Sequence, residues 1–478
     1  MNDFLSLAAQ SSPERLALIT SDVEITYGEL NQRVAVLSSR LDAAGIQAKD
    51  RVAVLLDRGL ASGELVHALA RLGAVIVPLN TRLTSTEMRW QIEQSDSRWV
   101  LSVLPAPLLE EAILLDDLPR MGESDQWLGS PLDLDADFGI LFTSGTTGKP
   151  KGAVLTWGNI FWSATASAFR LGVLPSDRWL LTLPLYHIGG LAILFRSALY
   201  GTAVVLPDYP GDPFDLEQLW RKMHNADVTL VSLVPTMLYR LMDRYEKEDW
   251  PLSLRLILLG GAAATLKLLR AARDAYLPLA LTYGLTEATS QVATTDPELT
   301  RLKPGTVGKP LQWLQVSIHD EDGQHLPAGE IGEVWVQGPM VMRGYLHQAT
   351  GNDWLHTGDL GYLDDEGDLR IVQRRSDLII SGGENIYPAE IEAVIRQHPA
   401  VTDACVVGLP NLEWGQQVAA AITLRPDASL DEKSLLSFCQ QHLASYKLPR
   451  QMVILDTLPR TSSGKVQRDK VIDQFSRN

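Results

Sequence analysis

Short apolar segments that alternate with helical ones constrain the fold of this chain most. Residues 52–56 resemble a strand, Leu65, Leu69 and Leu72 recur on one face of a helix, and residues 74–77 resemble a second strand. The same alternation returns later, with strand candidates at residues 179–183, 203–206, 228–234 and 256–259 and helical stretches at 216–224 and 236–245. Continuously apolar strands are typical of parallel sheets covered by helices on both faces. The pattern predicts an α/β fold with doubly covered, mainly parallel sheets.

The length of the chain and a change in its sequence pattern predict more than one domain. With 478 residues, 45% of them hydrophobic, the chain exceeds a single ordinary core. Between about 302 and 373 it consists of short β-like pieces with turns such as Asp322-Gly323, and from about 374 onward it has a compact α+β pattern. We expect an N-terminal domain over residues 1–373, with a small β-rich subdomain at about 302–373, and a small C-terminal α+β domain over 374–478.

Charge and cysteine content exclude several classes of protein. The 58 acidic and 42 basic residues give a net charge of -16, which disfavours nucleic acid and anionic membrane surfaces as partners. Cys405 and Cys439 are too few for a disulfide framework, and residues 1–10 lack the basic lead and apolar core of a secretion signal. No apolar run approaches the ~20 residues that span a bilayer. We expect a cytoplasmic protein without integral membrane association.

A loop rich in glycine, hydroxyl groups and lysine follows a predicted buried strand at residues 139–142. The segment 141–153 holds four hydroxyl residues, three glycines and two lysines. Glycines let backbone N–H groups approach an anion, hydroxyls add donors and lysines supply positive charge, which suits a polyphosphate. The spacing is not that of a P-loop NTPase, because Gly148-Lys149 is followed by proline. From composition alone, a flexible surface loop is the alternative.

Two carboxylates stand at positions where α/β proteins bind ligands. Glu287 ends the segment 283–287 behind the strand candidate 279–282, at a carboxyl edge where it could hold Mg²⁺. Asp359 lies between two glycines in a predicted turn, where it could accept both hydroxyls of a ribose. A solvated or capping glutamate and an ordinary turn aspartate are the alternatives.

The C-terminal part contains two further unusual segments. Residues 374–385 join a charged cluster to an apolar strand and to the pair Gly382-Gly383, and Lys465 stands on a glycine-containing loop. An exposed lysine is usually only a solubilising charge, so neither segment identifies a site by itself.

Taken in this order, these motifs closely resemble the acyl-adenylate-forming family of acyl-CoA synthetases, adenylation domains and luciferases. The resemblance covers nearly the whole chain and rests on the segments 143–152 (TSGTTGKPKG), 283–287 (YGLTE), 357–359 (TGD) and 463–465 (SGK). In that family ATP and a carboxylic acid give an acyl-AMP and pyrophosphate, and a thiol then displaces AMP to give a thioester. The resemblance implies ATP, Mg²⁺ and coenzyme A, with a small-molecule carboxylic acid as the partner.

The resemblance also implies a role for each residue of the nucleotide site. The glycine and hydroxyl loop would wrap the β- and γ-phosphates, Glu287 would hold Mg²⁺, and Thr286 would contact the α-phosphate. The residues 260–262 resemble the adenine wall, with Tyr283 opposite, and Asp359 and Arg374 resemble the ribose ligands. The implied ATP- and AMP-binding set is Thr143, Ser144, Gly145, Thr146, Thr147, Gly148, Lys151, Gly260, Gly261, Ala262, Tyr283, Gly284, Asp359 and Arg374.

For the C-terminal domain the resemblance implies movement and a catalytic lysine. Lys465 would bridge the attacking carboxylate and the α-phosphate during adenylation. The domain would rotate between the two half-reactions about Ser376, where the family more often has Asp or Lys. After rotation, Ser381, Gly382 and Gly383 would line the tunnel for the thiol arm of CoA.

The acyl pocket of the family is built around a segment that here spans residues 184–190. His187 would gate the carboxylate or pack against the acyl group, and Gly261 and Ser290 would also contact the acid. No acidic residue lies between 183 and 200, so an α-amino acid substrate is disfavoured. Arg196 lies nine residues after His187 in an apolar stretch, which fits a second carboxylate on the acid. An arginine that snorkels from a helix or is paired in the core is the alternative.

This pattern is similar to that of the o-succinylbenzoate:CoA ligases of menaquinone or phylloquinone biosynthesis, within the same family. Arg196 would then meet the benzoate carboxylate, and the aryl ring would need an apolar slot, for which Leu191, Ile193 and Val292 are candidates. The expected catalytic residues are Lys465, Thr286, Glu287 and His187. The alternatives are an acyl-CoA synthetase for a fatty or arylpropenoic acid and a non-catalytic nucleotide-binding protein of the same fold. The sequence leaves homo-oligomerisation open.

Overall fold

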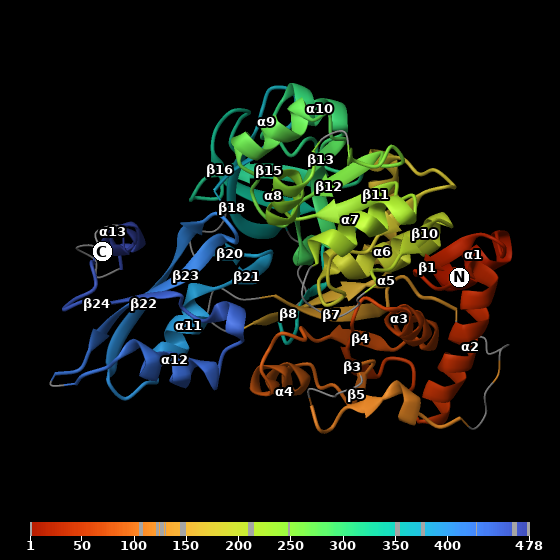
Figure 1. Cartoon of the computed structure of the whole chain (residues 1–478), viewed down its shortest axis with the longest axis horizontal. Coiled ribbons are helices and arrows are strands. Elements are labelled where there is room, and N and C mark those ends of the chain that lie inside the picture. Colours follow the sequence, from red (N-terminus) through yellow and green to blue (C-terminus); the bar gives the residue numbers. More distant parts are fainter. Residues whose placement is uncertain are drawn as a thin grey trace. The chain divides into compact units, whose positions relative to one another are not determined.

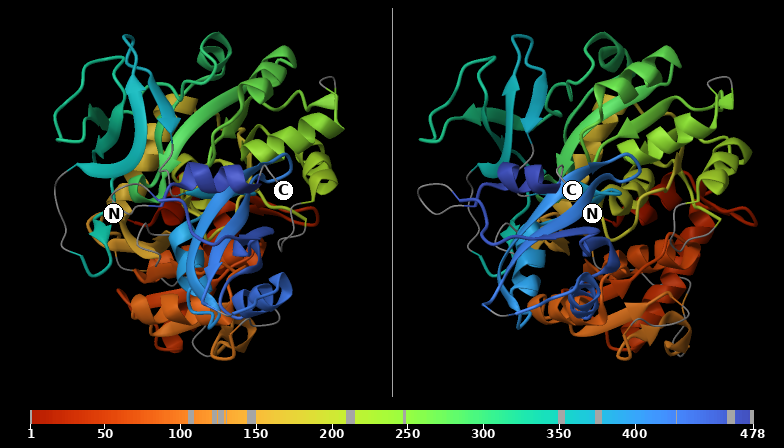
Figure 2. Two further views of the ribbon diagram at one scale, coloured as in Figure 1. Left: turned by 90° about the vertical axis from the view of Figure 1, so that its left-hand side faces the viewer. Right: turned by 60° about the vertical axis from the view of Figure 1, so that its left-hand side comes forward.

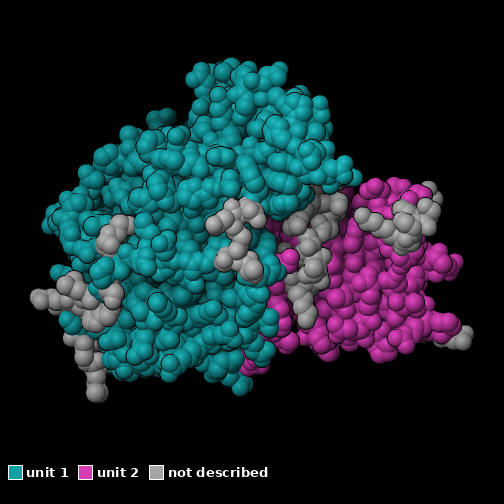
Figure 3. Space-filling model, turned by 180° about the vertical axis from the view of Figure 1, so that it is seen from behind, with its two compact units in different colours: residues 1–81, 92–141, 152–373 teal, residues 82–91, 142–151, 374–478 magenta. Residues whose placement is uncertain are grey.

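A computed structural model describes most of the chain. It leaves out residues 1, 105–108, 121–123, 125–128, 130, 144–149, 209–214, 247–248, 349–353, 374–377, 427, 461–465 and 476–478. The chain divides into two compact units, which Figure 3 colours separately: residues 1–81, 92–141 and 152–373, and residues 82–91, 142–151 and 374–478. The units differ from the predicted domains in the short segments 82–91 and 142–151, and the division into domains at residue 374 stays a prediction.

The larger unit contains an eight-stranded sheet with a parallel interior. Its strands, in spatial order, are β14 (Ser290–Thr294), β13 (Leu279–Leu285), β12 (Leu256–Leu259), β11 (Leu230–Leu233), β9 (Arg178–Leu180), β10 (Ala203–Val205), β1 (Leu16–Ile19) and β2 (Glu24–Thr26). The strands from β13 to β1 run parallel, and β14 and β2 are antiparallel at the two edges. Figure 1 labels β13, β12, β11, β10 and β1 of this sheet.

A second sheet has seven strands. Its strands, in spatial order, are β17 (Gly344–Tyr345), β8 (Lys151–Thr156), β7 (Asp137–Thr143), β4 (Val75–Pro78), β3 (Arg51–Leu55), β5 (Trp99–Ser102) and β6 (Ile113–Leu114). The pairs of β3 with β4 and β5, of β4 with β7 and of β5 with β6 are parallel.

Strand β12 shows why its segment is apolar throughout. Leu256 and Leu258 belong to a core that also contains side chains of the other sheet and of the helices between, whereas Ile257 and Leu259 belong to a second core. The first core draws on α1 (Phe4–Ser11), α2 (Tyr27–Ala43), α3 (Leu60–Leu72), α5 (Trp157–Leu171) and α6 (Ile188–Tyr200). The second draws on α7 (Leu216–Asn225), α8 (Pro235–Arg244) and α9 (Leu266–Asp274). Both faces of the sheet are therefore covered, which confirms the predicted α/β class.

The predicted β-rich subdomain is an antiparallel four-stranded sheet. Its strands are β15 (Gln315–His319), β16 (Gly332–Gln337), β18 (Leu355–Leu363) and β19 (Leu369–Gln373). Val334, Val336 and Leu369 pack into one core with Tyr283 of β13. Two short helices complete the N-terminal part of the chain, α4 (Ser85–Gln94) and α10 (Pro297–Leu302).

The C-terminal part of the smaller unit is an α+β fold. The long antiparallel pair of β22 (Val401–Asn411) and β23 (Gly415–Leu424) lies at its centre, as Figure 2 shows from two sides. Around this pair lie β20 (Ile379–Ser381), β21 (Glu384–Ile386), β24 (Gln451–Ile454), α11 (Pro388–Ile395), α12 (Glu432–Gln440) and α13 (Arg468–Phe475). Across the described residues, no helix combines the length and the apolar character that a membrane span requires.

Candidate functional site

Tyr283 and Asp359 meet although they are far apart in the sequence. The Tyr283 hydroxyl donates a hydrogen bond of 2.7 Å to Oδ2 of Asp359, and both residues are buried. Tyr283 comes from β13 and Asp359 from β18, so the contact joins the eight-stranded sheet to the β-rich subdomain. The predicted turn at Asp359 is wrong, since the residue lies inside β18. Gly358 has a φ of +72°, and Asp359 N donates to Thr357 Oγ1 at 3.1 Å, so a local kink orients the carboxylate within the strand.

The Gly260-Gly261 pair follows β12 directly, as predicted. A side chain at Gly260 would lie 2.5 Å from Cγ2 of Thr282 on the neighbouring strand, so only glycine fits there. Gly261 has a φ of +79° and is exposed, and Ala262 continues the same turn. The turn leaves the carboxyl edge of the sheet with bare backbone, which a flat ring can approach closely.

Glu287 lies on a single 3₁₀ turn, Thr286–Ala288, behind β13. Its Oε1 accepts a hydrogen bond of 2.8 Å from the Tyr345 hydroxyl, and its backbone oxygen accepts one from Met342 N. Thr286 begins the same turn and is half-buried. The motif therefore presents one anchored carboxylate next to a hydroxyl at the carboxyl end of β13.

Backbone geometry behind Glu287 is unusual. Thr289 and Ser290 both have positive φ values, 52° and 93°, which non-glycine residues rarely adopt. The carbonyl of Thr289 accepts from Ser163 Oγ at 2.6 Å, and its hydroxyl donates to Met340 O at 2.7 Å, so the strained turn is held from both sides. It brings β14 back so closely that a side chain at Gly284 would lie 1.8 Å from Ser290 O. Gly284 thus has a packing reason to be glycine.

His187 caps the start of α6 with extended backbone. Its ring lies 4.7 Å from that of Tyr186, centroid to centroid, and the residue is half-buried. A side chain at Gly190 would lie 2.3 Å from Pro184 O, so the segment 184–190 needs this glycine to turn tightly into the helix. The turn positions His187 at the N-terminal end of α6.

Arg196 lies on α6 with only 2% of its surface exposed. Its guanidinium carbon is 5.1 Å from the centroid of the Trp179 ring, on β9. Nε and Nη2 are buried, and neither has a hydrogen-bond partner among the described residues. Burial lowers the pKa of the guanidinium, and nearby Tyr200 raises it, but an arginine stays charged. The alternative of an arginine that snorkels to solvent is excluded by this burial, and a core ion pair is absent among the residues that the structure describes.

Further buried polar atoms lie on β14, which neighbours β13. Gln291 Nε2 donates to Thr294 Oγ1 at 3.0 Å, whereas Gln291 Oε1 has no partner in the described part of the chain. Thr294 Oγ1 in turn lies 2.8 Å from Thr282 Oγ1 on β13. Strand β14 contacts α6, the helix of Arg196.

The apolar slot expected from Leu191, Ile193 and Val292 is not one cluster. Val292 packs in the core around Tyr283, whereas Leu191 and Ile193 pack in the core between the two sheets.

In the smaller unit, Ser381, Gly382 and Gly383 form a tight hairpin between β20 and β21. Gly382 and Gly383 have φ values of +60° and +87°, the pattern of a two-residue hairpin turn. Gly382 N donates to Trp414 O at 2.9 Å, and a side chain at Gly382 would lie 2.8 Å from the Trp414 ring. The glycines therefore give this turn a narrow, side-chain-free surface.

The structure describes only some of the predicted residues of the phosphate loop and the C-terminal domain. Thr143 ends β7 and Lys151 begins β8, and Thr143 Oγ1 donates to Lys151 O at 3.5 Å. The other predicted residues of the phosphate loop, and those proposed for the ribose, the hinge and the catalytic lysine, lie outside the described residues: Ser144, Gly145, Thr146, Thr147, Gly148, Arg374, Ser376 and Lys465.

The contacts of Tyr345 and Trp179 with the site residues were not predicted from the sequence. Tyr345 reaches Glu287 because β17 pairs with β8, a pairing between residues nearly two hundred positions apart that no local pattern announces. Trp179 was assigned to a strand, but its contact with Arg196 depends on how α6 crosses the sheet.

Comparison with known proteins gives this geometry a context. Residues 5–346 match the AMP-binding enzyme family, and residues 390–465 match the AMP-binding enzyme C-terminal domain. The 2-succinylbenzoate--CoA ligase of Bacillus subtilis (strain 168) is 40% identical over 482 residues, which cover 98% of this chain and 97% of that protein.

Solved structures of o-succinylbenzoate CoA synthetase from Bacillus subtilis are similar over the whole chain. A double mutant bound to the product analogue OSB-NCoA has a TM-score of 0.93 at 39% identity, covering 99% of this chain and 98% of that one. The complex with the acyl-adenylate intermediate OSB-AMP has a TM-score of 0.75 at 39% identity, covering 98% of both chains. The complex with ATP and magnesium ion has a TM-score of 0.74 at 39% identity, covering 98% of this chain and 99% of that one.

The family and the curated relatives match the chain over most of its length. The segments that carry the Tyr283–Asp359 contact, the Glu287 turn and the Gly260 turn fall within a chain that matches one family over most of its length and a set of curated relatives from end to end. This chain belongs to the AMP-binding enzyme family.

Proposed function

We propose that this protein is an ATP-dependent acid:CoA ligase that converts o-succinylbenzoate to o-succinylbenzoyl-CoA through an acyl-AMP, a step of menaquinone biosynthesis. The observation that carries the choice of acid is the buried Arg196, a cation without an anionic partner among the described residues. A buried uncompensated charge is costly, and a protein keeps one where a ligand supplies the opposite charge. A second carboxylate on the acid would do so.

The reaction balances in two steps. A carboxylate oxygen of the acid attacks the α-phosphorus of ATP, and the bond to pyrophosphate breaks with its electron pair on the leaving group. The sulfur of CoA then attacks the acyl carbon, AMP leaves with the bonding electrons, and the thiol proton is lost. Substrates of the protein are accordingly small molecules: the acid, ATP and CoA.

The nucleotide would bind along the carboxyl edge of the eight-stranded sheet. Gly260, Gly261 and Ala262 would form the adenine wall, and Asp359, held by Tyr283, would accept the ribose hydroxyls. Arg374 would be the second ribose ligand, Thr286 would contact the α-phosphate, and the loop from Thr143 to Lys151 would bind the outer phosphates.

Glu287 fits a magnesium ion that arrives with ATP. Mg²⁺ is commonly bound through one or two carboxylates and the phosphates of the substrate rather than by a protein cage. Glu287 offers one carboxylate fixed by Tyr345, and no group of three or more acidic, histidine or cysteine side chains within the described ranges could hold a metal alone. The bound ion would offset charge on the leaving pyrophosphate.

The acid would lie along α6, with Arg196 at one end and the reacting carboxylate near His187. Gly261 and Ser290 would contact it, and Gln291, whose amide oxygen is buried without a partner in the described region, is a further candidate. The guanidinium offers Nε and Nη2 as donors to the benzoate carboxylate, with the geometry of a charge-assisted pair.

The C-terminal domain, residues 374–478, would supply the remaining groups. Lys465 would bridge the attacking carboxylate and the α-phosphate, and the domain would then turn about Ser376. The hairpin of Ser381, Gly382 and Gly383 would line the path of the CoA thiol, since both glycines leave the turn without side chains. A cytoplasmic location and the oligomeric state stay predictions.

A panel of acids tests the proposal. Acid-dependent pyrophosphate release is measured with o-succinylbenzoate, with 4-oxo-4-phenylbutanoate, which lacks the aryl carboxylate, with a fatty acid and with an arylpropenoic acid. We expect o-succinylbenzoate to be preferred by at least about a hundredfold, the worth of two charge-assisted hydrogen bonds. Preference for a fatty or arylpropenoic acid would replace the proposed substrate, and no release with any acid would indicate a non-catalytic protein.

The role of Lys465 is tested in the same assay. We expect Lys465→Ala to slow acyl-AMP formation by orders of magnitude, with a much weaker effect on thioester formation from supplied acyl-AMP. Equal losses in both steps would refute the assigned role.

A further inference from the structure

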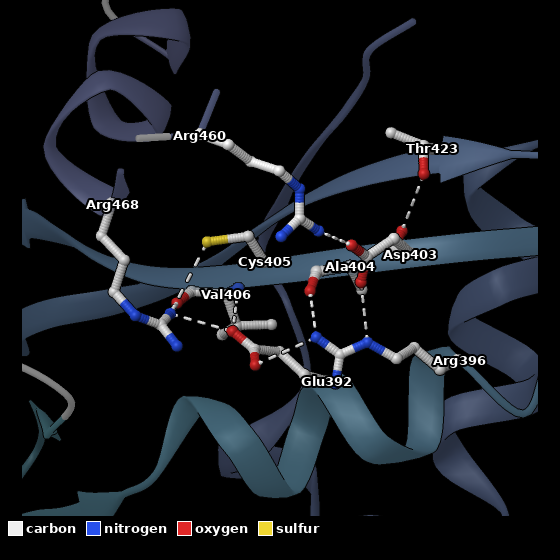
Figure 4. A network of polar contacts seen from close by, with 9 residues as sticks. All are labelled: Glu392, Arg396, Asp403, Ala404, Cys405, Val406, Thr423, Arg460 and Arg468. Atoms are coloured by element: carbon white, nitrogen blue, oxygen red, sulfur yellow. Dashed lines mark hydrogen bonds and ion pairs between the residues drawn. The ribbon is translucent and has the colours of Figure 1, made fainter. Parts of the chain in front are cut away.

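A network of ionic contacts joins α11, β22 and the last helix of the chain (Figure 4). Glu392 of α11 is at its centre and is buried. Its Oε1 accepts from Val406 N at 2.9 Å and pairs with Arg468 Nη1 at 2.9 Å, and its Oε2 lies 3.4 Å from Arg396 Nη2. Arg468 also donates to the carbonyl oxygen of Val406, so the first residue of α13 is attached to the centre of β22.

The same network extends to Arg460. Arg396 Nε donates to Asp403 Oδ1 at 2.9 Å, and Arg396 Nη2 donates to Ala404 O at 2.7 Å. The other carboxylate oxygen of Asp403 pairs with Arg460, as Figure 4 shows. Burial alone would raise the pKa of Asp403, but its bonds to Arg396 and Ala404 and the charge of Arg460 hold that pKa below its usual range. Asp403 is therefore ionised throughout the neutral range, and the pair with Arg460 persists there.

The two outer arginines stand on either side of one short segment. Arg460 forms an antiparallel bridge with Val466, and Gln467 N donates to Pro459 O at 2.9 Å. Arg460 and Val466 are thus paired, and Arg468 stands two residues after Val466. Residues 461–465 lie between these anchors, and Lys465 is the last of them.

The ion pairs of Arg460 and Arg396 contribute more to the position of the side chains than to the stability of the domain. Arg460 and Arg396 expose 45% and 42% of their side chains, and ion pairs at that exposure add little to the free energy of folding. Their geometry is nevertheless specific, because Arg396 pairs with both Glu392 and Asp403 and so fixes the two acidic acceptors relative to each other. A network that adds little stability but has a fixed geometry suits residues that position a catalytic group.

We propose that the brace formed by Glu392, Arg396, Asp403, Arg460 and Arg468 positions the segment that carries Lys465, which makes Arg460 and Asp403 positioning residues for adenylation. The inference rests on the proposed role of Lys465. Misplacement of a catalytic group by about 1 Å can cost on the order of a hundredfold in rate. Loosening one anchor should therefore affect the half-reaction that needs Lys465 and spare the other.

The test compares Arg460→Ala and Asp403→Asn with the unmodified protein in both half-reactions. We expect each variant to slow acid-dependent pyrophosphate release, measured without CoA, by about tenfold or more, and to change thioester formation from supplied acyl-AMP by less than about twofold. The double variant should be no slower than the slower single variant, because Asp403→Asn already weakens the contact that Arg460→Ala removes. Arg460→Lys, which keeps the charge, should restore part of the adenylation rate.

A matched control and a reference variant make the outcomes separable. Asp431→Asn removes a carboxylate of the same domain that caps α12 through Ser434 N, away from the brace, and should leave the ratio of the two half-reactions unchanged. Equal slowing of both steps in Arg460→Ala, or no slowing of adenylation, would overturn the brace. If Lys465→Ala left adenylation intact, the proposed role of Lys465 would fall; if only Lys465→Ala slowed adenylation, the brace alone would fall.

Discussion

Replacement of Arg196 by methionine should stabilise the protein and disable it toward its substrate. Methionine fills a similar volume without a charge, so the variant removes a buried cation whose Nε and Nη2 have no acceptor among the described residues. Replacing buried charge by a well-packed apolar group is commonly stabilising by about 1–4 kcal/mol. Loss of the contact with the Trp179 ring costs about 0.5–2 kcal/mol in return. We expect the free energy of unfolding without acid to rise by roughly 1 kcal/mol.

The effect on activity should have the opposite sign. Two hydrogen bonds to a charged acceptor contribute about 1.5–3 kcal/mol each, which corresponds to a loss of kcat/KM for o-succinylbenzoate of about 10²- to 10⁴-fold. The rate with 4-oxo-4-phenylbutanoate, which offers no second carboxylate, should change little. The variant should therefore lose the preference between the two acids.

Urea unfolding and steady-state kinetics on the two acids measure both effects. Arg255→Met is the matched control, because Arg255 is fully engaged: its Nη2 pairs with Asp177 Oδ2 at 2.6 Å, and its Nη1 donates to Leu171 O at 3.0 Å. That variant leaves the buried Asp177 without its cation and should be destabilised. If Arg196→Met were destabilised like Arg255→Met, or kept its preference for the dicarboxylic acid, Arg196 would be a structural arginine and the reasoning would be refuted.

Three further predictions concern other parts of the larger unit. Gly284→Ala should lower the free energy of unfolding by about 3 kcal/mol, because the new side chain would meet Ser290 O at 1.8 Å, whereas Gly63→Ala, which meets only a leucine methyl at 3.2 Å, should be nearly neutral in the same denaturant titration. Burial lowers the pKa of His67 to about 4 from an ordinary 6.5, so its contribution to the free energy of unfolding is fully present above pH 6.5 and should fall by about 2 kcal/mol on going to pH 5. His67→Gln should flatten this dependence on pH, and an unchanged dependence would show that His67 is not its source. Tyr345→Phe removes the hydrogen bond that holds the Glu287 carboxylate, so the magnesium concentration needed for half-maximal pyrophosphate release should rise several-fold. An unaltered magnesium titration would count against that contact.

The regular elements were readily predicted, since their patterns are local. The apolar segment 256–259 coincides with β12, and the helical stretches near α7 and α8 differ from the observed helices by about one residue at their ends. These segments lie between two cores or on one, so burial alone determines their composition.

Asp359 shows where a local pattern was insufficient. Two flanking glycines are typical of a turn, yet the residue lies within β18, because pairing with β16 continues on both sides of it and pairing with β19 begins at Leu360. Strand pairing is a contact between distant residues, and glycine spacing cannot report it.

Arg196 and Tyr345 show the same limit for the site. An arginine in an apolar helix can be exposed, paired or uncompensated, and only the packing of α6 against β9 distinguishes these cases. Tyr345 gains its role from the pairing of β17 with β8. In both cases the type of residue was visible in the sequence, but its environment depended on the tertiary fold.

The central claim is tested most directly by following both half-reactions on one sample. The protein is incubated with ATP, Mg²⁺ and o-succinylbenzoate without CoA, the products are identified by mass spectrometry, and CoA is then added. The account predicts o-succinylbenzoyl-AMP with an equal amount of pyrophosphate, followed by its conversion to the CoA thioester and AMP. Formation of ADP and phosphate, or adenylation of a fatty or arylpropenoic acid in preference to o-succinylbenzoate, would contradict it.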